Sequence, residues 1–279
     1  MLEDDRVAAA RNNAGRCDIV CVSHGLLRDA ATLGERAAAL RSGGQAGRWF
    51  VARGGGAPMV DDEVAELAGI WGPPTYSAPV RADRLAQFAG VVPDLLLACW
   101  RRYGFAGFGN GSFWLCDPEV WQPAVDAWTS GLALPGEERW IAVSRSAFGD
   151  LQVWGQQTGS RLTITAQYGW VVHTDRADRA MSDDRRNDRL YALLMCQDRR
   201  SVDLLGADEK PLFDRILALR GPVGPDTIYG FVPALGLGGA LRPDRAEIFD
   251  GPVHLELLAE LSERRIVDKE DLLHMWIGQ

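Results

Sequence analysis

Four short segments between residues 140 and 173 alternate hydrophobic and polar side chains with a period of two, which is the pattern of β-strands. Short turns rich in Gly, Gln and Asp separate them. Strands joined by turns this short pair as an antiparallel meander. The expected strands are Trp140–Ser144, Leu151–Trp154, Arg161–Thr165 and Gly169–His173.

Helical patterns precede this meander. Asp117-Pro118 combines an N-cap acceptor with a proline at the first helical position, so a helix begins there. Pro123 lies too deep for one smooth helix, which predicts a single turn followed by a helix over about 123–130. A strand is expected over 112–116. Two further helices are expected over 61–68 and 93–103.

Helical patterns also follow the meander. The stretch Asp175–Arg189 is charged and reads as a loop. Three helices are then expected, over 189–196, 208–219 and 252–264, and in the last one His254, Leu257, Leu258 and Leu261 lie at helical spacing. The predicted fold class is therefore α+β, with a small helical N-terminal domain packed on an antiparallel strand meander that is covered by C-terminal helices.

Tryptophan is unusually frequent in the middle of the chain. Ten Trp occur among the 279 residues, and six of them fall between residues 100 and 154. Because each indole buries a large apolar area, this density predicts one large aromatic cluster.

The apolar run Tyr229–Gly239 is dense in glycine and contains no charge. Such a run is either a buried turn or a loop that presses its backbone against a ligand. Its Gly236-Leu-Gly-Gly-Ala-Leu241 core lacks the sixth-position Gly or Ala and the following helix of a dinucleotide site, and no Lys-Ser/Thr follows it. We therefore expect a structural turn anchored by Tyr229, Phe231 and Leu235.

Composition limits the function further. The formal net charge is −8, and an acidic chain binds nucleic acid poorly but suits a basic protein partner. No run approaches the length of a membrane span, and the N-terminus has no apolar signal region, which predicts a cytoplasmic protein. No nucleophile–base pattern is visible, so we expect no enzyme, no cofactor and no metal; Cys17, Cys21 and His24 form only half of a zinc site.

Residues 1–58 differ from the rest, with loop-like glycine stretches that end in Arg53-Gly-Gly-Gly-Ala-Pro58. We expect them to be a disordered or mis-assigned extension. From Met59 onward the helical and strand patterns become tighter.

Two blocks of sequence together resemble a known pair of domains. The first comprises Val92–Gly104, Gly111–Glu119 and Trp128, and it resembles the GAD-like domain of bacterial toxin-immunity proteins. The second comprises Ser146–Gly155, Gly224–Gly239 and His254–Leu261, and it resembles the C-terminal domain of the same proteins, which protect against DNase effectors of type VI secretion. The resemblance covers about residues 59–266. It implies a GAD-like domain over 59–131 and an immunity-protein C-terminal α+β domain over 132–279.

The resemblance implies a cytosolic inhibitor that binds a cognate toxin, a nuclease, and blocks its active site. The alternative is a small-ligand sensor or regulatory domain that uses the glycine-rich run. Acidic side chains are the candidates for toxin contact because they could replace DNA phosphate in a basic groove: Asp61, Asp62, Glu63, Asp175, Asp178, Asp183 and Asp184. The residues expected to be a structural signature of the family are Phe148, Gly149, Asp150, Tyr229, Gly230, Phe231, Pro233, Gly238 and Gly239.

Overall fold

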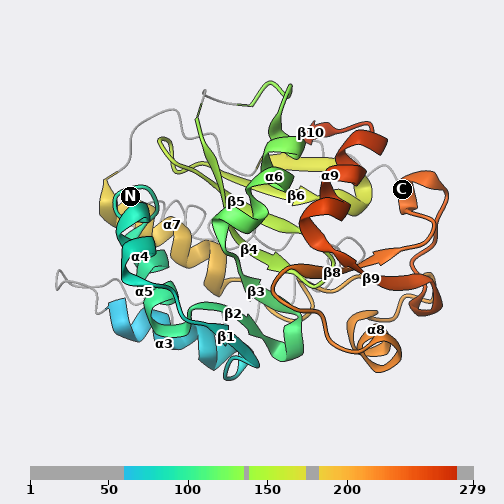
Figure 1. The fold of residues 1–279 in the computed structure, drawn as a ribbon, viewed down its shortest axis with the longest axis horizontal. Helices are drawn as coiled ribbons and strands as arrows, with labels where there is room; N and C mark the ends of the chain where they lie inside the picture. Colours follow the sequence, from blue (N-terminus) through green and yellow to red (C-terminus); the bar gives the residue numbers. More distant parts are fainter. Residues whose placement is uncertain (1–59, 135–137, 174–181, 269–279) are drawn as a thin grey trace, which may run out of the picture.

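A computed structural model of the chain describes residues 60–134, 138–173 and 182–268. Its centre is an eight-stranded sheet in the order β1-β2-β3-β4-β5-β6-β7-β10 (Figure 1). Every neighbouring pair is antiparallel except β7 and β10, which are parallel. The strands are Tyr76–Ala78, Phe105–Phe108, Phe113–Leu115, Trp140–Ser146, Leu151–Gly155, Arg161–Thr165, Trp170–His173 and Arg265–Val267.

The predicted meander is confirmed as β4 to β7, and the predicted α+β class is confirmed with it. The N-terminal part of the chain is more than a helical cap, because it adds β1, β2 and β3 to the same sheet. β1 and β2 were not predicted. They are three and four residues long, and segments this short carry little periodic signal.

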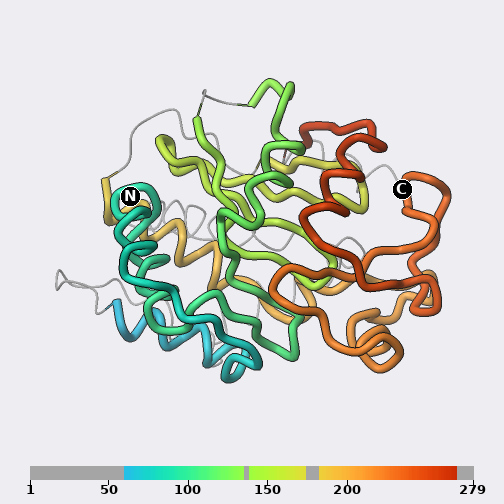
Figure 2. The backbone as a smooth tube through the Cα atoms, in the orientation of Figure 1, coloured from blue at the N-terminus to red at the C-terminus, as the bar shows by residue number. Residues whose placement is uncertain are grey.

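Helices cover both faces of the sheet. One face carries α3 (Val60–Trp71), α4 (Ala82–Phe88), α5 (Asp94–Tyr103) and α7 (Asp183–Met195), and the other carries α6 (Pro118–Thr129) and α9 (Gly251–Leu261). The helices α6 and α9 are far apart in sequence but lie side by side (Figure 2), and the Trp128 Nε1 donates a hydrogen bond to the Leu255 carbonyl at 2.9 Å. The two faces thus have separate cores.

A third core joins a small second sheet to the rest. This sheet pairs β8 (Thr227–Phe231) with β9 (Ala246–Asp250) in antiparallel register, and α8 (Phe213–Arg220) packs beside it. The prediction of a single tryptophan cluster is therefore wrong. Trp100 and Trp154 lie in the first core, Trp121, Trp128 and Trp140 in the second, and Trp114 in the third.

Two predictions about helices are wrong. The helix α6 runs unbroken from Pro118 to Thr129 with Pro123 inside it. A proline removes one backbone hydrogen bond there, and the burial of Trp121 and Trp128 on either side of it offsets that loss. The stretch expected to be a loop through Arg189 is helical from Asp183, because α7 buries Leu190, Leu193 and Leu194.

The other predicted helices agree with the structure apart from their ends, whereas α4 and the strands β8, β9 and β10 were not predicted. The first helix runs to Trp71 instead of ending at Ala68, and α8 begins at Phe213 rather than at Asp208. The predicted N-cap of α6 is confirmed, because the Asp117 side chain accepts a hydrogen bond from the Glu119 backbone N–H.

Candidate functional site

The acidic side chains predicted to contact a partner lie at two helix starts. Asp61 and Asp62 are exposed in the first turn of α3, and Asp183 and Asp184 are exposed in the first turn of α7. Carboxylates in these positions are stabilised by the unpaired backbone N–H groups of the first turn. Both helices start on the left of Figure 1, away from α9.

The remaining acidic candidates are placed differently. Glu63 is turned inward and is only 7% exposed, so it offers little surface to a partner. Asp175 and Asp178 lie outside the described residues.

Several residues of the predicted signature, from the two halves of the chain, meet at one joint. The turn between β4 and β5 places Phe148 against Phe231, with stacked rings whose centroids are 6.3 Å apart. The Tyr229 N–H donates a hydrogen bond to the Ala147 carbonyl at 2.9 Å, which ties β8 to this turn. The joint therefore holds the small sheet onto the large one.

Polar groups fix the shape of the turn at this joint. The Ser146 hydroxyl donates to the Asp150 carboxylate at 2.9 Å and accepts from the backbone N–H groups of Phe148 and Asp150. Gly149 adopts a φ of 84°, and a Cβ there would lie 2.8 Å from the Ile228 Cδ1. Only glycine fits such a position.

A buried guanidinium supports the joint from the side. Arg145 lies between the indoles of Trp114 and Trp121, with its Cζ 4.8 Å from each ring centroid. Its Nη2 donates to the Gly224 carbonyl at 2.5 Å, just ahead of β8. Burial lowers the pKa of Arg145 to about 10, so the side chain stays charged at neutral pH.

The glycine-rich run has two unlike halves. The prediction of a turn is wrong for the first half, because Tyr229, Gly230 and Phe231 belong to the strand β8 and are buried. Pro233, Gly236 and Gly238 are exposed around the 3₁₀ turn η4 (Leu235–Leu237). The expected anchors Tyr229 and Phe231 are buried, and Leu235 is half-buried.

The tightest glycines of the run press against the chain's own atoms. A Cβ at Gly230 would lie 2.6 Å from the His254 Nε2, and a Cβ at Gly239 would lie 1.8 Å from the Pro233 carbonyl oxygen. These two glycines are therefore explained by internal packing rather than by a ligand.

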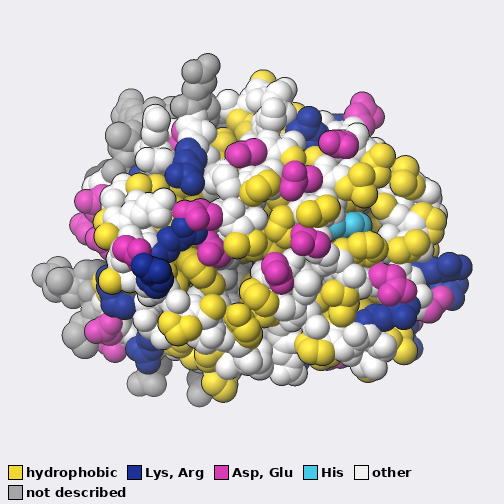
Figure 3. Space-filling view, viewed as in Figure 1, with side chains coloured by type: hydrophobic (Ala, Val, Ile, Leu, Met, Phe, Trp, Pro, Cys, Tyr) yellow, Lys and Arg dark blue, Asp and Glu magenta, His cyan; other side chains and the backbone are white. Residues whose placement is uncertain are grey.

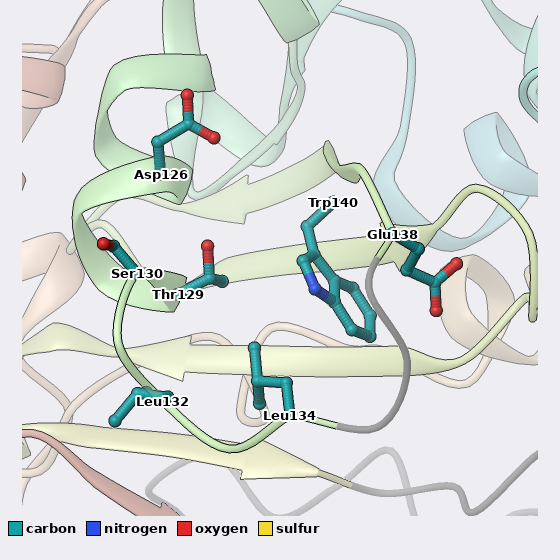
Figure 4. A pocket seen from close by; sticks show the side chains of 7 residues that line it. All are labelled: Asp126, Thr129, Ser130, Leu132, Leu134, Glu138 and Trp140. Carbon is teal, nitrogen blue, oxygen red and sulfur yellow. The ribbon is translucent and has the colours of Figure 1, made fainter.

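An open cavity of about 570 Å³ lies between the end of α6 and the start of β4 (Figure 4). Its carboxylates, Asp126 and Glu138, lie on opposite sides of Trp140 and do not converge on a common point. The Glu138 carboxylate accepts hydrogen bonds from the backbone N–H groups of Gln157 and Thr158, so it holds a turn. The residues that line the cavity are Asp126, Thr129, Ser130, Leu132, Leu134, Glu138 and Trp140. None of them belongs to the glycine-rich run.

Two thiols and the possible metal ligands are candidates for chemistry in the described residues. Burial raises the pKa of Cys99 and of Cys116 to about 12, so both thiols stay protonated. In the same part of the chain, no three His, Cys, Asp or Glu side chains are grouped to hold a metal ion. Cys17, Cys21 and His24 lie outside it. Nor is any helix of the described part long and apolar enough to cross a membrane.

Comparison with known families matches both halves of the chain. Residues 64–168 match the model of the GAD-like domain, and residues 189–262 match the model described as the C-terminal part of the T6SS immunity protein Tdi1. The predicted resemblance to this pair is thereby confirmed.

Solved structures agree on the fold. The crystal structure of Atu4351 from Agrobacterium tumefaciens superposes with a TM-score of 0.62 at 20% sequence identity. The alignment covers 71% of this chain and 89% of that one. No curated protein is similar enough in sequence to count as a match.

The two matched segments share one continuous structure. The GAD-like match spans α3 through β6 and thus supplies most of the large sheet, while the Tdi1-type match includes α8, the small sheet and α9. The sheet continues across residue 131, where the sequence analysis divides the chain; that division stays a prediction. Residues 1–58 lie outside the described residues.

One surface feature of the Tdi1-type domain was not predicted. The outer face of α9 carries Val253, Leu257 and Leu261, all exposed. The sequence held no decisive signal, because adjacent residues such as Leu257 and Leu258 can both lie within the apolar stripe of one helix.

Proposed function

We propose that this chain is an immunity protein that binds a cognate toxin of type VI secretion and blocks its active site. The observation that carries the proposal is the match of residues 189–262 to the T6SS immunity protein Tdi1 family. A protein that acts by occlusion needs a complementary surface and no catalytic group of its own, so we propose a non-enzymatic role.

We further propose that the toxin is a DNase and that the two proteins meet in the cytoplasm. A nuclease needs a basic groove to hold DNA phosphates, and a chain with a net charge of −8 is electrostatically complementary to such a groove. Bacterial DNA lies in the cytoplasm, so an inhibitor has to be present there.

The exposed carboxylates of Asp61, Asp62, Asp183 and Asp184 are proposed to speed the encounter with a basic toxin. They lie at solvent-exposed helix starts, where charge acts at a distance and is screened by salt. This role affects the association rate more than the lifetime of the complex.

Co-expression tests the proposed function. The growth-arresting product of a gene that flanks this one is expressed in a host with and without this chain, and both colony formation and the integrity of chromosomal DNA are measured. Restored growth with intact DNA supports the proposal. DNA that stays intact during growth arrest by the toxin alone contradicts the DNase assignment, and arrest that the chain does not relieve contradicts the immunity function.

A further inference from the structure

Exposed hydrophobic side chains concentrate in one part of the molecule. Of the eleven large ones that are exposed among the described residues, six lie between residues 232 and 261. They are Val232, Leu237, Ile248, Val253, Leu257 and Leu261. Figure 3 shows hydrophobic side chains gathered over this side of the molecule, with acidic ones between them. Single exposed hydrophobic residues are ordinary, whereas a contiguous group calls for a partner.

The centre of this group is the outer face of α9. Val253, Leu257 and Leu261 are four residues apart, so they form one stripe along the helix. The opposite stripe, with Leu255, Leu258 and Ala259, is buried in the core shared with α6. The helix is thus apolar on two faces, and among the described residues only one of them is packed against other elements.

The 3₁₀ turn η4 extends the stripe at its C-terminal end. Leu237 in this turn is 58% exposed. A Cβ on the preceding residue, Gly236, would lie 4.0 Å from the Ser262 Oγ, directly after α9. The exposed half of the glycine-rich run therefore lies beside the end of the helix.

Acidic side chains flank the stripe without basic partners. Glu256 and Glu260 lie on α9 between its apolar positions, and neither has an ion-pair partner among the described residues. Residues 246–263 contain five acidic residues and no Lys or Arg. Glu247 on β9 is already paired with Arg220, so the free negative charge beside the stripe is that of Glu256 and Glu260 on α9. An apolar centre with carboxylates beside it suits a partner with the opposite charge.

We propose that the outer face of α9, formed by Val253, Leu257 and Leu261 with Leu237 at its end, is the surface on which the cognate toxin docks. The toxin contributes an apolar segment flanked by Lys or Arg, which pair with Glu256 and Glu260. This proposal rests on the proposed function and adds to it the place of contact and the chemistry of the partner. The surface also lies within the segment that matches the immunity family.

A second copy of the chain is not electrostatically complementary to this surface. In a twofold dimer the same patch meets itself, so Glu256 and Glu260 of one copy would face those of the other. Like charges brought together at an interface weaken it. A basic partner removes this conflict, and the nuclease proposed above is basic where it binds DNA.

Two matched substitutions test the surface. Leu257→Arg places a bulky positive charge at the middle of the stripe, where it repels a basic partner. Leu219→Arg is the control, because Leu219 is also on a helix and is 60% exposed, compared with 49% for Leu257. Arginine is a good helix former, so neither change at an exposed site should alter the melting temperature appreciably.

The measurement is the affinity of each purified full-length variant for the growth-arresting product of the flanking gene, made by cell-free synthesis. We expect Leu257→Arg to raise Kd at least about tenfold, as truncation of central interface residues does, and Leu219→Arg to leave it unchanged. Equal affinity of Leu257→Arg and wild type overturns the surface while leaving the proposed function intact. Failure of the wild type itself to bind contradicts the proposed function.

Analytical ultracentrifugation of the same variants tests whether a second copy of the chain binds to the outer face of α9. We expect the wild type and Leu257→Arg to sediment as the same species. If the wild type is a dimer that Leu257→Arg dissociates while the toxin affinity is unchanged, the face of α9 is an interface between copies, and the proposal is wrong.

Discussion

Two kinds of surface are exposed: the acidic starts of α3 and α7, and the apolar outer face of α9. They differ in how much their side chains contribute to the stability of the fold. Asp61 and Asp183 stabilise the helices that they begin, so their presence is explained without any partner. Leu257 and Leu261 are exposed, so their apolar side chains add no hydrophobic burial to the stability of the fold. Other residues of α9 already form its contact with the core. The unexplained side chains therefore indicate binding better than the charged ones do.

The charged helix starts and the apolar face of α9 are expected to play different parts in toxin binding. Exposed carboxylates act over about 8 Å at physiological ionic strength and raise the rate at which a basic partner arrives. Apolar contacts act only once water is excluded, and they set how long the complex lasts. We therefore expect substitutions at the helix starts and on α9 to affect different kinetic constants.

The largest effect is expected from Gly230→Ala, which disturbs α9 from within. Its Cβ would push against the His254 Nε2 at 2.6 Å, and His254 is on the buried side of α9. We expect the free energy of unfolding, measured in urea, to fall by about 1–3 kcal/mol. Toxin binding should weaken with it, although no residue of the outer face is changed.

Gly236→Ala is the control for this change. A Cβ at Gly236 would meet only the Ser262 Oγ, at 4.0 Å, so we expect stability close to that of the wild type. Equal stability of the two variants would show that Gly230 does not hold α9 in place.

The next largest effect is expected on the rate of association with the toxin when both negative charges on the outer side of α9 are reversed. Glu256→Lys together with Glu260→Lys removes the attraction to a basic partner and replaces it with repulsion. Stopped-flow association with the toxin should slow roughly tenfold or more at low ionic strength, and the difference from wild type should shrink as salt is added. A difference that is independent of salt would contradict a charged rim.

A smaller effect on binding is expected from Asp61→Asn with Asp62→Asn, and from Asp183→Asn with Asp184→Asn. Each pair should lower the free energy of unfolding, by about 0.3–1 kcal/mol per residue, because the first turn loses its negative charges. Toxin association should slow only a few-fold, with an unchanged dissociation rate. A dissociation rate that rises more than in Leu257→Arg would reverse the comparison and place the contact at these helix starts.

The smallest effect is the contribution of His254, on the buried side of α9, to the pH dependence of stability. Burial lowers the pKa of His254 below its ordinary value of 6.5, so the unfolded chain takes up this proton more readily than the folded one. Its contribution to stability is present above pH 6.5 and is lost as the pH falls from there to the lower pKa of the folded state.

Urea unfolding at several pH values between 5.5 and 7.5 measures this effect. We expect His254→Gln to flatten the dependence relative to the wild type, whatever its effect on stability at pH 7.5. An identical slope in both proteins would show that His254 does not titrate in this range.

The sequence predicted the large elements because their signals are local. The strands β4 to β7 carry a clear period of two, and Asp117-Pro118 combines two signals for the start of α6. The unbroken helix at Pro123 and the helical start at Asp183 were missed because packing decided them. Burial of Trp121, Trp128 and Leu190 outweighs a weak local preference.

The proposed surface on α9 could not be predicted from the sequence, for a related physical reason. A charge is visible in the sequence wherever it lies, so Asp61 and Asp183 stood out. Whether Leu257 faces the core or the solvent depends on how α9 is rotated against α6, which is fixed by contacts such as that between Trp128 and Leu255. Only the folded chain shows that Leu258 is buried and Leu257 is not.

Hydrogen–deuterium exchange of the chain with and without its toxin tests the central comparison most directly. The account predicts that toxin binding slows exchange in α9 and in the turn at Leu235–Leu237, with little change at 60–63 and 183–186. Protection confined to the starts of α3 and α7, with α9 unchanged, would contradict it.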